Sequence, residues 1–234
     1  PRAALSGNPS DGFGGMTISF VFSDFKAEVR LMEHERIEVL PGKVDHLNWD
    51  DLNEFEKSVS SMGYYGGLRL LKATLLVFTK HCKTNDINLH NRGIKLSYDT
   101  NIPVLLGLSG SSAIISACLR ALGNWYNVKM EPWLLANLAW QVETEELGIP
   151  AGLQDRVAQA YNYPVFMDFD AGHFNSKPHG KYDKLTRPLK NIYIAYSGTL
   201  AEGSEKTHSN LRGRFNNGDT EMLEAVEKWK QLTL

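Results

Sequence analysis

The chain has 234 residues, with 25 Lys and Arg against 27 Asp and Glu, so its formal net charge is −2. Apolar residues make up 42% of the sequence and charged residues 22%, which is typical of a soluble globular protein. Proteins that bind nucleic acid or membrane surfaces through charge need a basic excess, which is absent here. No apolar run approaches the roughly 18 residues of a membrane span.

The two cysteines cannot form a disulfide framework, and no Cys-x-x-Cys pair indicates a zinc site. We therefore expect a cytoplasmic protein in a reducing environment. The chain lacks an initial Met and ends within a helical pattern that has no cap, so we expect it to be trimmed.

The first 40 residues have the pattern of β-structure. We predict a strand over residues 2–6, a β-hairpin formed by residues 16–22 and 25–32, and a further strand over residues 36–40. In residues 25–32, apolar and charged side chains alternate, which is the period of a half-buried strand.

The middle and end of the chain are mainly helical. Leu52, Phe55, Val59 and Met62 are spaced as on one helix face, and a glycine-rich break at residues 63–67 ends that pattern. We predict helices over residues 52–62, 68–78, 111–126, 132–146, 152–161, 204–216 and 220–232, with strands over 93–98, 164–168 and 191–196.

The order of these elements indicates the fold class. Strands and helices do not alternate regularly, so we predict an α+β fold rather than a doubly wound one. The polar stretch 170–190 contains Gly172, Pro178, Gly180 and Pro188, and indicates a soft domain boundary.

The segment from Pro103 to Ala113 says most about function. It is rich in Gly and Ser, follows a predicted strand and precedes a predicted helix. Glycines allow close approach of the backbone to a ligand, and the positive end of a helix suits a phosphate. The alternative is a loop that only caps the helix. The segment lacks the Lys of a Walker A motif and is not a G-x-S-x-G elbow.

A second segment carries two carboxylates, Glu143 and Asp155, on either side of a turn at Gly148. Asp155 is expected in the first turn of a helix, where it could simply cap the helix. Glu143 is expected near a helix C-terminus, where a negative charge is disfavoured, although it could belong to a solvated face. Two carboxylates beside a hydroxyl-rich glycine loop are the groups that phosphoryl transfer requires.

A third segment begins with a strand at Arg2 and continues as a polar loop through Asn8 and Asp11 to Gly15. Asn8 and Asp11 are suited to hydrogen bonding with sugar hydroxyls. The same residue types more commonly form a turn.

Together the three segments resemble those of the GHMP kinases, the superfamily of galactokinase, homoserine kinase and mevalonate kinase. The residues from Arg2 to Asp11, from Pro103 to Ala113 and from Glu143 to Asp155 match its motifs. Within the superfamily, the chain is most similar to the plant-type glucuronokinases. It departs from galactokinases at Asn8-Pro9, which replaces Glu-His, and it lacks the third, C-terminal glycine-rich motif.

The resemblance implies a two-domain α+β fold with the active site in the interdomain cleft. We expect an N-terminal domain over residues 1–175 and the start of an incomplete C-terminal domain over residues 176–234. The implied activity is phosphorylation of D-glucuronate at its anomeric hydroxyl, dependent on ATP and Mg²⁺. The alternatives are another GHMP sugar kinase, of galactose, fucose or heptose-phosphate type, or a non-catalytic binding protein of the same fold.

The resemblance also implies site residues. Asp155 and Arg2 would be catalytic, Glu143 with Ser111 or Ser112 would hold Mg²⁺, and Asn8 and Asp11 would bind the sugar. The loop that cradles the ATP phosphates would consist of Gly107, Leu108, Ser109, Gly110, Ser111 and Ser112.

A uronate carboxylate needs a cationic or amide partner, because burying it unpaired is costly. Arg156, next to Asp155, is the first candidate for this role, with a surface ion pair as the alternative. Tyr64 and Tyr65 are candidates for a wall of the sugar site, or for core positions. Residues 203–209 are a candidate lip over the site, or a solvated helix start. The seven histidines are not paired at metal spacing, so we expect no transition metal.

Overall fold

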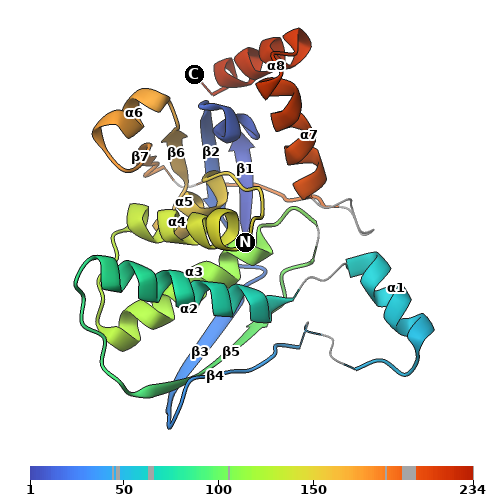
Figure 1. Ribbon diagram of the computed structural model, residues 1–234. Coiled ribbons are helices and arrows are strands. Elements are labelled where there is room, and N and C mark those ends of the chain that lie inside the picture. The colour runs from blue at the N-terminus through green and yellow to red at the C-terminus, as the bar shows by residue number, and fades with distance from the viewer. Residues whose placement is uncertain are drawn as a thin grey trace.

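The computed structural model describes residues 1–233 except 44, 46, 47, 63–65, 105, 188 and 197–203, and leaves out the side chains of residues 61, 62 and 204–209. Its strands form two sheets (Figure 1). The first sheet has the order β1-β2-β6-β7, and its neighbouring strands are all antiparallel. These strands are β1 (Arg2–Ser6), β2 (Met16–Val21), β6 (Val165–Asp168) and β7 (Lys181–Lys184).

The second sheet has the order β3-β5-β4. β3 (Ala27–His34) pairs antiparallel with β5 (Gly93–Thr100) along its full length. The two-residue strand β4 (Glu38–Val39) pairs parallel with β5.

The predicted hairpin of residues 16–22 and 25–32 is therefore wrong. β2 pairs with β1 and β6, whereas β3 belongs to the other sheet, so the residues between them lead the chain from one sheet to the other. Alternation of apolar residues indicates which face of a strand is buried, but it does not identify the neighbouring strand.

Four helices lie between the two sheets (Figure 1). α3 packs on β3 and on α2, and α5 packs on β2 and on α4. α4 continues directly into a π-helical turn, η2 (Val142–Glu146). The four helices are α2 (Gly67–Thr84), α3 (Gly110–Tyr126), α4 (Pro132–Gln141) and α5 (Gln154–Tyr161).

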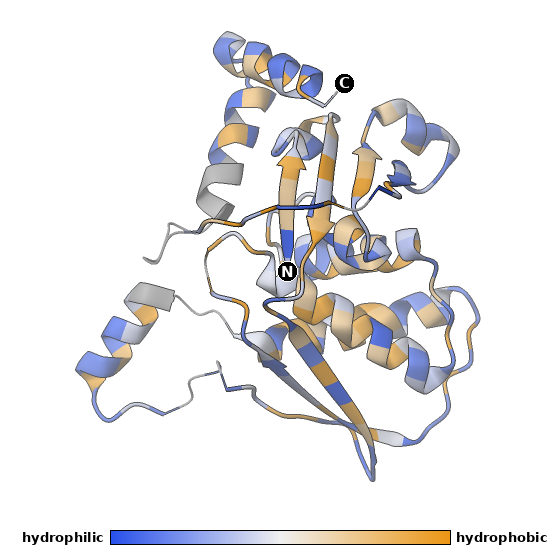
Figure 2. Cartoon of the chain, turned by 180° about the vertical axis from the view of Figure 1, so that it is seen from behind, coloured by the Kyte–Doolittle hydropathy of each residue, from blue (hydrophilic) through white to orange (hydrophobic). Residues whose placement is uncertain are grey.

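The apolar core joins these helices to both sheets. Phe78 of α2, Leu96 of β5, Leu119 of α3 and Met167 of β6 are all completely buried within one cluster. Figure 2 shows apolar residues gathered on the strands and on the central helices. The core therefore holds both sheets and the central helices in one structure.

The remaining elements lie around this centre. They are η1 (Ser10–Phe13), a 3-10 turn after β1, and the helices α1 (Leu52–Met62), α6 (Ala171–Ser176), α7 (Ser204–Asn216) and α8 (Thr220–Gln231). α8 buries Met222 and Val226, whereas its Leu223 is 44% exposed and Leu52 of α1 is 83% exposed. Among the described residues, no helix combines the length and the apolarity needed to cross a bilayer.

The predicted strand over residues 191–196 is also wrong. These residues pair with no strand among those described, and Tyr193 is 93% exposed. β7 was not predicted from the sequence, and it occupies the outer edge of the first sheet within the stretch expected to be a boundary. The division into domains at residues 175 and 176 stays a prediction.

Candidate active site

The glycine and serine loop leads directly into α3. Gly107 has φ 71°, and Ser109 has φ 59° and ψ 45°, so both lie in the left-handed region that turns the chain sharply. α3 then starts at Gly110 and runs for 17 residues. Its first N–H groups have no carbonyl partner within the helix and lie at its positive end. Gly107 is exposed, whereas Leu108 is buried beneath the loop.

Ser109 is held at both its carbonyl and its hydroxyl. Its carbonyl oxygen accepts hydrogen bonds from Gln159 Nε2 at 3.0 Å and from Ser112 Oγ at 3.1 Å. Its hydroxyl donates to Asp155 Oδ2 at 2.8 Å. Ser112 is completely buried, so its hydroxyl points into the structure and not toward Glu143.

Asp155 lies in the first turn of α5, between two guanidinium groups. Arg2, at the start of β1, donates to Asp155 Oδ1, and Arg156 Nη1 lies 3.5 Å from Oδ2. Burial raises the pKa of the Asp155 carboxyl, but the charges of Arg2 and Arg156 and the Ser109 hydrogen bond outweigh burial and hold it below its ordinary value. Asp155 is therefore an ionised carboxylate at neutral pH.

Glu143 is buried in the η2 turn that ends α4, with 1% of its surface exposed. Ser111 Oγ donates to Glu143 Oε1 at 2.7 Å, and Arg156 Nε donates to Oε2 at 2.8 Å. Arg156 Nη2 donates to the same oxygen, and Nη1 donates to the Gly152 carbonyl at 2.8 Å. π-helical turns inside α-helices occur frequently at functional sites.

The donor set fits Mg²⁺. Glu143 supplies a carboxylate and Ser111 a hydroxyl, which are the hard oxygen ligands that Mg²⁺ prefers, and Mg²⁺ commonly uses only one or two protein carboxylates. Among the described residues, no group of three or more His, Cys, Asp or Glu side chains is arranged to hold a metal ion. A magnesium ion at this site would therefore complete its coordination with phosphate oxygens and water.

The polar loop after β1 lies against the start of α5. Asp11 Oδ2 accepts a hydrogen bond from the Gln154 N–H at 3.3 Å, whereas Asn8 is exposed. A Cβ atom on Gly152 would overlap the Asp11 carboxylate, so glycine at this position permits the close approach. The structure thus places Asp11 beside the segment that carries Asp155.

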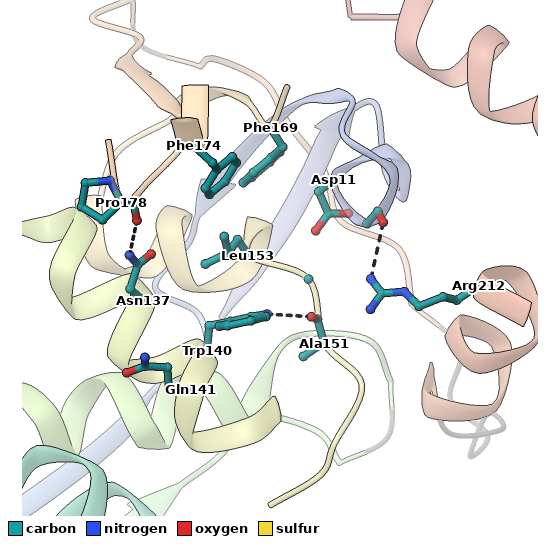
Figure 3. A pocket seen from close by; sticks show the side chains of 12 residues that line it. Asp11, Asn137, Trp140, Gln141, Ala151, Leu153, Phe169, Phe174, Pro178 and Arg212 are labelled. Carbon is teal, nitrogen blue, oxygen red and sulfur yellow. Dashed lines mark hydrogen bonds between the residues drawn. The ribbon is translucent and has the colours of Figure 1, made fainter. Parts of the chain in front are cut away.

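A pocket of about 370 Å³ opens beside this segment (Figure 3). Asp11 and Arg212 lie at one end of it, and Pro178 and Asn137 at the other. Its apolar walls consist of Trp140, Leu153, Phe169 and Phe174.

The walls of this pocket are fixed by hydrogen bonds to the backbone. Trp140 Nε1 donates to the Ala151 carbonyl at 3.0 Å, and Asn137 Nδ2 donates to the Pro178 carbonyl at 2.6 Å. The pocket-lining roles of Trp140, Phe174 and Arg212 were missed by the sequence analysis. No motif marks these residues, and an aromatic residue on an amphipathic helix has the same sequence pattern as a core position.

The structure thus brings together Arg2, Ser109, Ser111, Glu143 and Asp155, which come from five separate elements or loops. It places Arg156 among them as the partner of Glu143. Tyr64, Tyr65 and Gly203 lie outside the described residues, as do the side chains of residues 204–209. The roles assigned to all these residues stay predictions.

Residues 69–163 match the family described as the GHMP kinases N-terminal domain. The chain is thus similar to the GHMP kinases. It is 40% identical over 231 residues to Glucuronokinase 1 of Arabidopsis thaliana, and 39% identical over 236 residues to Probable glucuronokinase 2 of the same plant. These matches confirm the superfamily that the three motifs indicate.

These alignments cover 97% and 99% of this chain, but only 63% and 64% of the two plant proteins. The chain therefore spans less than two thirds of the length of these relatives. A solved structure of Streptococcus pneumoniae phosphomevalonate kinase superposes with a TM-score of 0.64 at 13% identity, covering 98% of this chain and 72% of that one. The α+β GHMP kinase fold is thereby confirmed.

Proposed function

We propose that the protein transfers the γ-phosphoryl group of ATP to the anomeric hydroxyl of D-glucuronate. The observation that carries the proposal is the Asp155 carboxylate, held by Arg2 and Ser109 next to the start of α3. The similarity to the two plant glucuronokinases supports the choice of sugar. Because the chain spans only part of their length, the proposal concerns the whole protein.

The roles follow from chemistry and position. The loop from Gly107 to Ser112 would bind the ATP phosphates through backbone N–H groups and hydroxyls. Asp155 would accept the hydrogen bond of the acceptor hydroxyl and orient it for in-line transfer. Its low pKa makes it a weak base, so its contribution would come mainly from positioning, as is general in phosphoryl transfer.

Arg2 would stabilise the negative charge that spreads over the transferring group, because its guanidinium already lies against Asp155. Ser111 and Glu143 would hold Mg²⁺, which supplies further neutralisation of phosphate charge when it is bound. Asn8 and Asp11 would hydrogen-bond the sugar hydroxyls.

The test is an assay of ADP release with ATP, Mg²⁺ and a panel of sugars that includes glucuronate, galactose, fucose and a heptose phosphate. We expect turnover of glucuronate, and a loss of roughly three orders of magnitude in kcat for Asp155→Asn. Turnover of galactose but not of any uronic acid would contradict the assignment of glucuronate as the substrate. An Asp155→Asn variant as active as the wild type would overturn the mechanism.

The alternative of a binding protein without activity is distinguished by the same assay combined with thermal unfolding. A GHMP-fold binding protein would release no ADP with any sugar. Stabilisation by Mg-ATP together with turnover supports a kinase, because a ligand that binds only the folded state raises the unfolding temperature by mass action.

A further inference from the structure

The carboxylate of a sugar acid needs a cation, and the structure places Arg156 elsewhere. Its side chain is only 6% exposed, and its donors are directed at Glu143 and at the Gly152 carbonyl. Turning Arg156 toward a substrate would break its hydrogen bonds to Glu143 and to the Gly152 carbonyl, a loss that Mg²⁺ bound at Glu143 would offset only in part. We therefore expect another cationic or amide side chain to bind the carboxylate of a sugar acid.

We infer that Arg212 binds this carboxylate in the pocket between α4, α6 and α7, and so selects an acidic sugar over a neutral one. The inference rests on the proposed function, because it assigns the acceptor substrate to this pocket. Arg212 is the one basic side chain that lines the pocket among the described residues.

The contacts of Arg212 leave most of its donor capacity available. Its Nη2 makes a long hydrogen bond of 3.4 Å to the Gly12 carbonyl, and it forms no ion pair within the described part of the chain. A guanidinium carries five N–H donors in a planar fork that matches the two oxygens of a carboxylate. Figure 3 shows this fork at the same end of the pocket as Asp11.

Aromatic packing holds Arg212 in place. Phe215 follows it by three positions on α7, and its ring packs against Phe13 with 5.0 Å between the centroids. Phe13 is the neighbour of Gly12, whose carbonyl accepts the Arg212 hydrogen bond. α7 is thereby fixed against the loop expected to bind the sugar, so the position of Arg212 does not depend on its own side chain alone.

The pocket is suited to a sugar ring. Its volume of about 370 Å³ falls in the range of small-molecule sites, which combine apolar walls with a few polar groups. Asp11 can accept from hydroxyls, and the aromatic walls can cover the C–H face of a ring. Gly152 and Leu153 line the pocket, and Asp155 follows on the same segment, so acceptor pocket and proposed reaction centre share one stretch of backbone.

The experiment compares D-glucuronate with D-glucuronamide, which has nearly the same shape but no charge. In the full-length protein, Arg212→Gln should raise KM for glucuronate about 10- to 100-fold, the effect of losing hydrogen bonds to a charged group. Its KM for glucuronamide should change less than threefold, and kcat for both should stay near wild type. Arg212→Lys should recover part of the affinity for glucuronate.

Arg30→Gln is the matched control, because Arg30 is a 71% exposed arginine on β3 that does not line the pocket. It should leave both KM values unchanged. An equal rise in KM for both sugars in Arg212→Gln would indicate a structural role and would overturn the inference. An unchanged KM for glucuronate would also overturn it. If Arg212→Gln raised KM for a sugar phosphate but not KM for glucuronate, the assignment of Arg212 to a carboxylate would be wrong.

Failure of the proposed function can be separated from failure of this inference by calorimetric titration of glucuronate, which requires no turnover. If the wild type binds glucuronate without phosphorylating it, and Arg212→Gln abolishes that binding, the proposed activity is wrong and the role of Arg212 stands. If the wild type phosphorylates glucuronate and both proteins bind it equally, the role of Arg212 is wrong and the activity stands.

Discussion

Asp155 is surrounded by groups that favour its charged form, and this has a consequence for stability. Because Arg2 and Arg156 lower its pKa in the folded protein, folding favours the ionised carboxylate. The resulting stabilisation is fully present above the ordinary Asp pKa of about 3.9. It is lost as the pH falls below that value and through the lower pKa of the folded protein.

We therefore expect the free energy of unfolding to lose the Asp155 contribution only below about pH 4, with no change from this residue between pH 5 and 9. This contribution is measured by urea unfolding of the wild type and of Asp155→Asn at a series of pH values from 3 to 8. The difference between the two proteins should be constant above pH 5 and should shrink toward pH 3. A difference that changes between pH 6 and 8 would contradict the assignment.

At the scale of residues, residue types and spacing predicted which side chains lie together, whereas their roles stay predictions. Arg2, Ser111, Glu143 and Asp155 lie together, as the motifs imply. The sequence could not show whether the hydroxyl of Ser111 or that of Ser112 lies next to Glu143. Adjacent residues on a helix point about 100° apart, and only the packing of α3 decides which hydroxyl faces inward.

The pairing of Arg156 with Glu143 could not be predicted from the sequence either. Its guanidinium reaches Glu143, thirteen positions earlier, only because α5 packs on α4. Arg212 has no motif at all, and it becomes visible as a binding residue only when α7 is seen beside the loop after β1.

At the scale of elements, α7 and α8 are attached to the loop after β1 through Phe13. Its ring contacts Phe215 of α7 at 5.0 Å and Trp229 of α8 at 6.1 Å, measured between centroids. This aromatic contact is what holds α7, and with it Arg212, beside the loop.

Phe13→Ala should lower the free energy of unfolding by about 2 kcal/mol, because a half-buried ring is lost. Because α7 would lose its packing contact with the loop after β1, KM for glucuronate should rise more than KM for ATP. Urea unfolding and steady-state kinetics measure the two effects. Phe55→Ala on α1 is the control, since that ring contacts Trp49 away from the pocket. An equal rise in both KM values would contradict the proposed attachment.

The strands show where sequence patterns stop being informative. The alternation in residues 25–32 predicted a strand, and β3 (Ala27–His34) is one, but it pairs with β5 (Gly93–Thr100), far along the chain. Residues 191–196 are apolar enough for a strand, yet β7 already occupies the edge of the first sheet beside β6. Helix positions were predicted better because a helix satisfies its own backbone hydrogen bonds, whereas a strand depends on a neighbour.

At the scale of the whole molecule, the two cysteines lie in the core that joins the central helices to the sheets. Cys82 of α2 and Cys118 of α3 are completely buried. Burial raises the pKa of both thiols, that of Cys118 to about 12. Since the thiolate is the reactive form, neither cysteine should react while the protein is folded.

We expect a disulfide reagent to label fewer than 0.1 thiols per chain in the native protein within an hour, and two in urea. In intermediate urea, labelling of both cysteines should follow the fraction unfolded measured by circular dichroism. Mass spectrometry of the labelled peptides identifies which cysteine reacts. Rapid labelling of Cys82 without loss of structure would show that α2 opens by itself.

The pairing of Arg2 with Asp155 joins two residues that are 153 positions apart in the chain. Bringing such distant residues together carries a large loop-closure entropy, so this contact cannot form before much of the intervening chain has folded. A nascent or partly folded chain would therefore have no reaction centre, and ATP and sugar would bind only the completed fold. If the proposed function holds, their binding energy would stabilise the folded state as a whole and would couple the survival of the protein to the supply of these substrates.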